Sequence, residues 1–87
     1  MNVMEISAAA RECVTTISGR RPEAVSRCER NDGGWQVTVE LIDTKARLAD
    51  NDIMATYQLK FDGEGELLGY ERTRRYIRGK NGGSFEA

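Results

Sequence analysis

Two stretches of this chain alternate apolar and polar residues so regularly that the fold must contain a β-sheet with one buried face. In the first stretch, the apolar positions are Trp35, Val37, Val39 and Leu41, and the polar ones are Gln36, Thr38 and Glu40. In the second, Ile53, Ala55, Tyr57, Leu59 and Phe61 alternate with Met54, Thr56, Gln58 and Lys60. Because successive side chains of a strand point to opposite faces, each stretch predicts a half-buried strand.

The N-terminal region has a different period, which predicts a helix. Its apolar residues recur at three- and four-residue steps, at Val3, Ile6, Ala10, Cys13, Val14 and Ile17. That spacing forms one apolar stripe on a helix. Gly19 stands where a left-handed C-cap belongs, and Pro22 prevents the helix from continuing. We therefore expect a helix from about residue 3 to residue 18 that covers one face of the sheet.

The segments around the two clear strands complete the prediction. Residues 23–30 contain few apolar side chains and predict at most a short, exposed edge strand. Residues 43–52 form a polar connection that either extends the two strands or makes an exposed loop. Asp-Gly at the start of 62–65 favours a hairpin turn, and residues 67–78 form the returning strand.

The resulting fold class is α+β, with one N-terminal helix packed on a three- to four-stranded antiparallel sheet. Residues 1–80 form this single domain, and residues 81–87 form a flexible C-terminal tail. The last strand does not keep one register, because Leu68, Tyr70 and Tyr76 share one parity whereas Leu67 and Ile77 take the other. A β-bulge around 72–74 would reconcile them, and Gly69 offers an alternative kink.

The length and composition of the chain limit its class. Its 87 residues make one domain, with 31% charged and 39% hydrophobic residues, as in a folded soluble protein. A domain of this size buries only about 60–65% of its unfolded-chain surface, so a partner or a homo-oligomer would stabilise it. No window reaches the roughly 18 apolar residues of a membrane span. The N-terminus lacks the pattern of a signal peptide, so we expect a cytoplasmic protein without membrane contact.

The residue types needed for most catalytic or metal sites are missing or badly spaced. The chain has no histidine, and Cys13 and Cys28 form no CxxC pair, so a Cys/His zinc site cannot be built. Two reduced thiols are favoured over a disulfide or redox pair. No glycine pair precedes the predicted helix as a phosphate loop would. The acidic residues at 40, 43, 50 and 52 match no calcium loop and are expected to be solvated. We expect no cofactor, no metal and no enzymatic activity.

One group of residues could carry a function, in and just after the last strand. It consists of Tyr70, Arg72, Arg74, Arg75, Tyr76, Arg78 and Lys80. Tyrosine and arginine are favoured anchors of protein interfaces, and together they also suit stacking on bases and contacts with phosphates. A third interpretation is pairing of these arginines with Glu40, Asp43 or Glu71 inside the domain. A net charge of −1 weighs against nucleic acid.

The orientation of this group depends on the regularity of the strand. In a regular strand, Arg72, Arg74 and Arg78 would share a face with the two tyrosines, and Arg75 would lie opposite. We predict a protein-binding surface on this strand, with five anchors: Tyr70, Arg72, Arg75, Tyr76 and Arg78.

The order of these motifs resembles the gas vesicle accessory proteins of the O type, the GvpO family. The resemblance rests on Gly34-Trp35, Val37 to Glu40, Ala55 to Tyr57, Gly65 to Leu67, and Tyr70, Arg72, Arg75, Tyr76, Arg78 and Gly79. It covers roughly residues 15–80, and the closing Y-x-R-x-x-R-Y-x-R-G is its most specific part. The chain departs from the family pattern at 47–50, where it has Arg-Leu-Ala-Asp in place of Arg-x-Pro-Asp.

The resemblance implies a non-enzymatic accessory or assembly factor in gas vesicle formation. Such a protein would act by contacts with other gas vesicle proteins, either shell or accessory, and would lie in the cytoplasm or on the vesicle. The alternative function is a small nucleic-acid-binding regulatory module that uses the same arginine- and tyrosine-rich strand.

Overall fold

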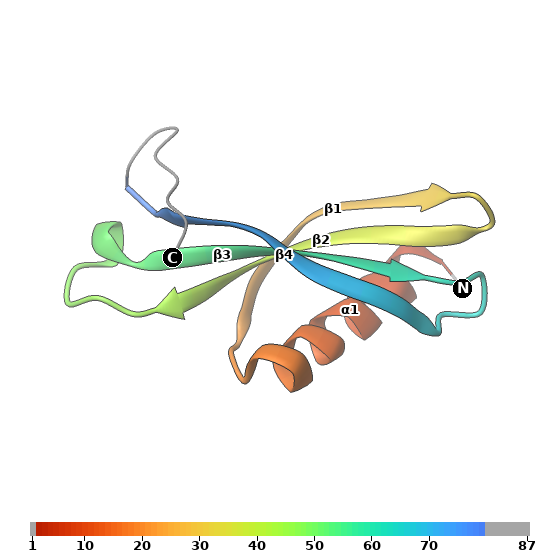
Figure 1. The fold of residues 1–87 in the computed structure, drawn as a ribbon, viewed down its shortest axis with the longest axis horizontal. Helices are drawn as coiled ribbons and strands as arrows, with labels where there is room; N and C mark the ends of the chain where they lie inside the picture. The colour runs from red at the N-terminus through yellow and green to blue at the C-terminus, as the bar shows by residue number, and fades with distance from the viewer. Residues whose placement is uncertain (1, 80–87) are drawn as a thin grey trace.

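The chain forms one helix followed by four strands in a computed structural model that describes residues 2–79. The elements are α1 (Val3–Ser18), β1 (Pro22–Asn31), β2 (Gly34–Thr44), the short 3-10 helix η1 (Ala49–Asn51), β3 (Ile53–Phe61) and β4 (Leu67–Ile77). The strands pair antiparallel in the order β1-β2-β3-β4, and α1 lies on one face of this sheet (Figure 1). The predicted α+β fold is confirmed. The predicted tail at 81–87 lies outside the described residues.

Both ends of α1 are capped, and the cap at Gly19 is the one that the sequence predicted. The Asn2 side chain accepts a hydrogen bond from the Glu5 backbone N–H, and the Glu5 carboxylate accepts one from the Asn2 backbone. This capping box satisfies N–H groups that have no partner within the helix. At the other end Gly19 adopts a left-handed φ of 71° and donates its N–H to the Thr15 carbonyl. The helix therefore ends where the glycine predicted.

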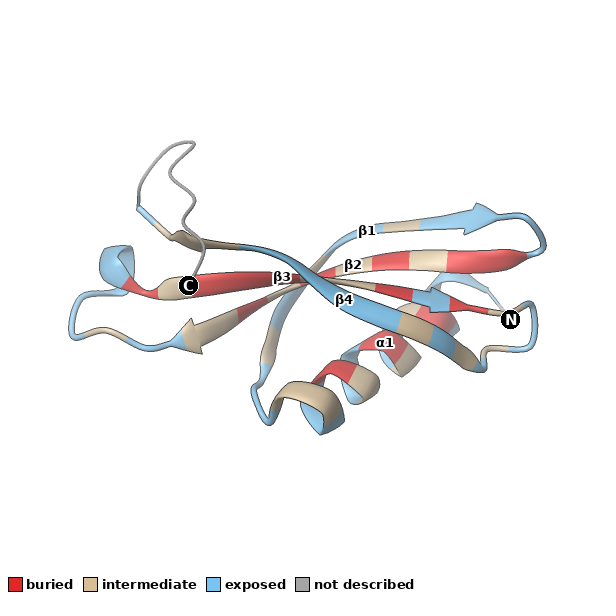
Figure 2. Ribbon diagram, in the orientation of Figure 1, coloured by how far each residue is buried: buried red, intermediate tan, exposed pale blue. Residues whose placement is uncertain are grey.

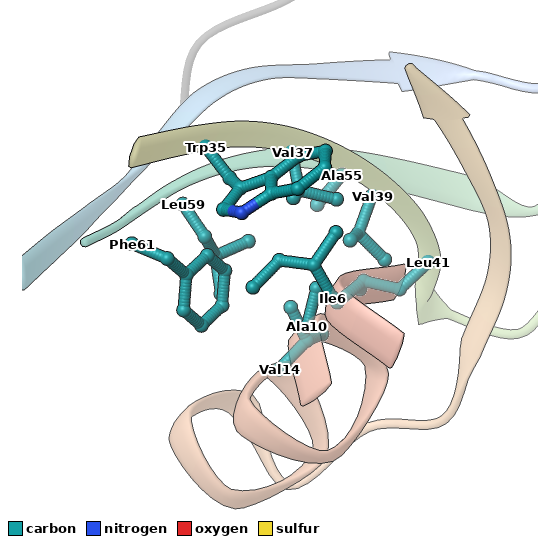
Figure 3. Close-up of a cluster of buried hydrophobic side chains, with 10 residues drawn as sticks. All are labelled: Ile6, Ala10, Val14, Trp35, Val37, Val39, Leu41, Ala55, Leu59 and Phe61. Carbon is teal, nitrogen blue, oxygen red and sulfur yellow. The ribbon is translucent and has the colours of Figure 1, made fainter. Parts of the chain in front are cut away.

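The core lies between α1 and the inner strands (Figure 3). Ile6, Ala10 and Val14 point from α1 toward the sheet and are fully buried. They meet side chains from β2 and β3, at Trp35, Val37, Val39, Leu41, Ala55, Leu59 and Phe61. The positions predicted to face the core on β2 are confirmed. Figure 2 shows that the two central strands are largely buried, whereas the two edge strands are largely exposed.

The first strand is longer than the sequence predicted. Residues 23–30 carry few apolar side chains, yet β1 runs from Pro22 to Asn31 and pairs with β2 along its whole length. An edge strand needs only its backbone groups to pair with the neighbouring strand, so low apolar content does not shorten it. Val25 and Cys28 are its side chains that pack against the core.

Both edge strands contain extra residues that interrupt the pairing. In β1 these are Glu23 and Ser26, and in β4 they are Leu68 and Thr73. The bulge predicted around 72–74 is therefore confirmed at Thr73, and a second irregularity lies next to Gly69. A bulge redirects nearby side chains and increases the local twist.

The connection between β2 and β3 uses both of the predicted arrangements. The β2 strand extends to Thr44, and Asp43 is an extra residue that has no counterpart on β3 in the strand register. The short helix η1 follows after a short loop. Gly79 donates its backbone N–H to the Asp50 carbonyl, and Arg78 donates its N–H to the Asp52 carbonyl. These bonds fix the end of β4 against the connection.

Candidate functional site

The sheet register sorts the five predicted anchor residues onto two faces. Tyr70 lies opposite Leu59, Arg72 opposite Tyr57 and Arg75 opposite Ala55, all on the α1 side of the sheet. Tyr76 lies opposite Met54 on the other face. The arrangement expected for a regular strand does not apply, because the strand is bulged and the extra residue Thr73 reverses the parity of the side chains after it.

Tyr70 and Arg72 are the exposed members of the group. Tyr70 keeps 53% of its surface accessible, and Arg72 is also exposed. Within residues 2–79, neither side chain makes a hydrogen bond or an ion pair. Because paired residues two apart on a strand point the same way, the ring and the guanidinium form one small surface. We call Tyr70 and Arg72 the exposed pair.

Arg75 and Arg78 have carboxylate partners within the domain. Arg75 Nη2 lies 3.0 Å from Asp43 Oδ2. Arg78 donates two hydrogen bonds to the Glu23 carboxylate, at 2.7 and 2.6 Å, and a longer one to Asp52 at 3.4 Å. The Arg78–Glu23 contact joins the end of β4 to the start of β1, at opposite edges of the sheet. Arg75 pairs with Asp43, one of the partners that the third interpretation named, whereas Arg78 pairs with Glu23 and Asp52, which it did not name.

Tyr76 belongs to a hydrogen-bonded cluster centred on Glu40. The Glu40 carboxylate accepts bonds from Thr56 Oγ1 at 2.6 Å, Tyr76 Oη at 2.9 Å and Ser26 Oγ at 3.0 Å. Burial raises the pKa of the Tyr76 hydroxyl, and its bond to Glu40 raises the pKa further. The Arg74 guanidinium lies 4.3 Å from the centre of the Tyr76 ring, a cation–π contact.

The prediction of solvated acidic residues was wrong for Glu40 and Asp52. Glu40 is half-buried among the three hydroxyls, and Asp52 is 2% exposed. Asp52 Oδ1 accepts the Ala46 backbone N–H at 2.8 Å. Sequence reasoning missed these roles because they depend on which residues the strand register places side by side. Threonine and serine in polar strand positions gave the available signal, but it does not specify an acceptor.

The Glu23–Arg78 contact makes stability depend on pH. The hydrogen bonds from Arg78 lower the pKa of Glu23 below its ordinary value of 4.5. The carboxylate of Glu23 therefore binds a proton more readily in the unfolded chain than in the folded domain. The contact stabilises the fold fully above about pH 4.5, and this stabilisation is lost as the pH falls through the folded-state pKa of Glu23. We expect the melting temperature of Glu23→Gln to lie below that of the wild type at pH 7 and to approach it near pH 3. Thermal melts between pH 3 and pH 7 test this expectation, with Glu64→Gln in the exposed turn as the control. A difference in melting temperature between Glu23→Gln and the wild type that stays constant with pH would contradict it.

Helix α1 leaves part of its own side of the sheet uncovered. It lies mainly against β1 and β2. A groove separates α1 from the start of β4 and is lined by Ala9, Glu12, Cys13, Thr16, Ile17 and Leu67. We call it the α1–β4 groove. Cys13 and Cys28 are free and half-buried, and burial together with Glu12 raises the pKa of the Cys13 thiol. A thiol in this environment stays protonated near neutral pH.

Two kinds of feature are missing from the described part of the chain. Across residues 2–79, no three acidic or cysteine side chains gather as a metal ion would require. In the same range, no helix is long and apolar enough to cross a membrane.

These features define a small α+β domain with a single helix on a twisted antiparallel sheet and an exposed aromatic–cationic pair on its last strand. The family model described as "Gas vesicle synthesis protein GvpO" matches residues 1–82, and the chain belongs to this family. No solved structure shows a significant match.

Curated relatives carry the same family name. The chain is 41% identical over 66 residues to "Gas vesicle protein O" of Streptomyces sp. (strain CB03234), a match that covers 75% of this chain and 51% of the relative. It is 36% identical over 70 residues to "Gas vesicle protein O1" of Halobacterium salinarum, covering 80% and 59%. A protein O of Haloferax mediterranei is 34% identical over 71 residues, covering 80% and 51%. The matches thus span only between half and three-fifths of these relatives.

Proposed function

We propose that this protein is a non-enzymatic accessory factor in gas vesicle formation that binds other gas vesicle proteins through its last strand. The family assignment supports a role in gas vesicle formation. The observation that supports the binding mode is the exposed pair, Tyr70 and Arg72, which has no side-chain hydrogen bond or ion pair within residues 2–79. In this proposal the protein acts in the cytoplasm or on the vesicle, and its partners are shell or accessory proteins.

The five predicted anchors have unequal roles in this proposal. Arg75, Tyr76 and Arg78 already stabilise the domain through Asp43, Glu40 and Glu23. The exposed pair can bind a partner without breaking a side-chain hydrogen bond or ion pair within residues 2–79. Tyrosine and arginine next to each other are also the residue types that dominate binding energy in protein interfaces. We therefore assign partner recognition to the exposed pair and a supporting role to the other three.

The proposal is tested by comparing capture of gas vesicle proteins by the wild type and by the double variant Tyr70→Ala/Arg72→Ala. Purified domain is added to extract of a cell that makes gas vesicles, and retained proteins are identified by mass spectrometry. We expect the variant to retain at least about tenfold less of the vesicle partner, as for loss of a central interface residue.

The matched control is Arg27→Ala, which removes an exposed arginine from the other edge strand. Its capture should equal that of the wild type, and all three proteins should share one melting temperature. Equal capture by the double variant would remove β4 from the interface. Capture of nucleic acid that falls log-linearly with salt would favour the alternative regulatory module.

A further inference from the structure

The α1 side of the sheet has room for a second helix. An α-helix with its side chains is about 10–12 Å across, and neighbouring strands lie about 4.8 Å apart, so one helix covers roughly two strands. The sheet has four strands; α1 lies mainly against β1 and β2, and the core beneath it also buries Ala55, Leu59 and Phe61 of β3. The surface over β4, next to α1, therefore lacks a covering element within residues 2–79.

The exposed surface there is apolar at one end and charged at its two sides. Ile17 and Cys13 on α1 face Leu67 on β4 across the α1–β4 groove. On the same side of the sheet, β4 continues from Leu67 through the exposed pair. Glu12 provides a carboxylate on the α1 wall of the groove. Arg72 provides a guanidinium farther along β4 on the same side of the sheet, beyond the residues that line the groove.

Both edges of the sheet are poorly suited to accepting another strand. The β4 edge is interrupted at Leu68 and Thr73, and the β1 edge at Glu23 and Ser26. Bulges of this kind are a common protection against edge-to-edge pairing. A partner is thus more readily bound by side chains on the face of the sheet than as an additional strand that pairs with the backbone of an edge.

We propose that the α1–β4 groove receives an amphipathic helix of the partner protein. This inference rests on the proposed function and adds the chemistry of the segment that is bound. The helix places apolar residues, spaced three and four apart, on Leu67, Ile17 and the Tyr70 ring. It carries an aspartate or glutamate on the flank that faces Arg72 and a lysine or arginine on the flank that faces Glu12. A helix lying in a hydrophobic groove is a recurrent mode of recognition.

Two neighbouring threonines of α1 allow a matched test of the groove. Thr16 lines the groove, whereas Thr15 is exposed and does not line it. Thr16→Arg should therefore reduce capture of the vesicle partner by about tenfold, and Thr15→Arg should leave capture unchanged. If Thr16→Arg binds normally while Tyr70→Ala/Arg72→Ala does not, the proposed function stands and the groove is not the site. If the Tyr70/Arg72 variant also binds normally, the proposed surface itself fails.

The bound segment is identified by a photo-crosslinking residue, p-benzoylphenylalanine, introduced at position 16 of the full chain in a cell that makes gas vesicles. The expected cross-linked peptide has apolar residues at helical spacing and an acidic residue on one flank. A peptide with strict alternation, or one from a second copy of this chain, would overturn the inference. So would the absence of a cross-link at position 16 when the same residue at position 70 gives one.

Charge exchange tests the predicted contact with Arg72. Arg72→Glu should reduce binding of the identified partner about tenfold or more, and replacing the facing partner carboxylate by lysine should restore it. Failure of every acidic-to-lysine change in that segment to restore binding would contradict the acidic flank.

Discussion

Gly34→Ala is expected to destabilise the domain by at least about 3 kcal/mol, a large part of the stability of a domain this small. A Cβ atom at position 34 would overlap the carbonyl oxygen of Phe61 and press on the Asp62 Cα. Both obstacles belong to the backbone, so no side-chain rotation relieves them. Phe61 is 1% exposed and part of the core, so a shift of its backbone would disturb the packing against α1.

Gly69→Ala is the matched control, because Gly69 also lies in a strand and a Cβ there would meet no atom within 4 Å. We expect this variant to be as stable as the wild type or up to about 1 kcal/mol more stable, since alanine has less freedom to lose on folding. Urea denaturation followed by tryptophan fluorescence reports both variants through Trp35. Similar midpoints for the two variants would show that the backbone around Phe61 can move freely, contrary to the packing described.

Glu40→Ala is expected to cost about 2–4 kcal/mol, although glutamate in a polar strand position usually looks replaceable. The substitution removes the acceptor for three hydroxyls, and Thr56 is only 6% exposed. Hydroxyls that lose their partner while shielded from water carry the cost of desolvation. The pKa of Tyr76 should also fall toward its ordinary value, because the bond to Glu40 contributes to raising it.

Glu71→Ala provides the comparison for Glu40→Ala, because Glu71 is an exposed glutamate on the same face of the sheet. Its effect on unfolding should stay within about 0.5 kcal/mol. Ultraviolet titration of tyrosine ionisation separates the two variants, since only Glu40→Ala should shift the titration of Tyr76. If both variants lose the same stability, the cluster around Glu40 is a surface feature and not a structural centre.

The sequence predicts the core-facing side of β2 well because burial there follows local alternation. On β3 the alternation is less complete, because Met54 and Thr56 of the opposite face are buried too. The core positions on β2 depend only on which side chains point together, and the caps of α1 depend on residues close to its ends. The pairing between strands is a different matter. The bulges at Glu23 and Ser26 exist because of how β1 aligns with β2, and nothing in residues 23–30 specifies that alignment.

The candidate site illustrates the same division. A bulge in the last strand was predictable because its apolar residues are split between two parities, with Leu68, Tyr70 and Tyr76 on one and Leu67 and Ile77 on the other. The separation of the five anchors into exposed and paired residues was not, because Asp43 and Glu23 become partners only through the extra residues in their strands. The closing motif of the chain was nevertheless specific enough to indicate the family.

The contact between Glu23 and Arg78 joins residues 55 positions apart. During synthesis, Arg78 is among the last residues of the domain to emerge from the ribosome. The helix and the first hairpin can form before that, but the Glu23–Arg78 contact between β1 and the end of β4 cannot form until nearly the whole domain has been synthesised. The exposed pair on β4 emerges in the same final stretch. A nascent chain therefore cannot offer this surface to a partner before its sheet is nearly complete.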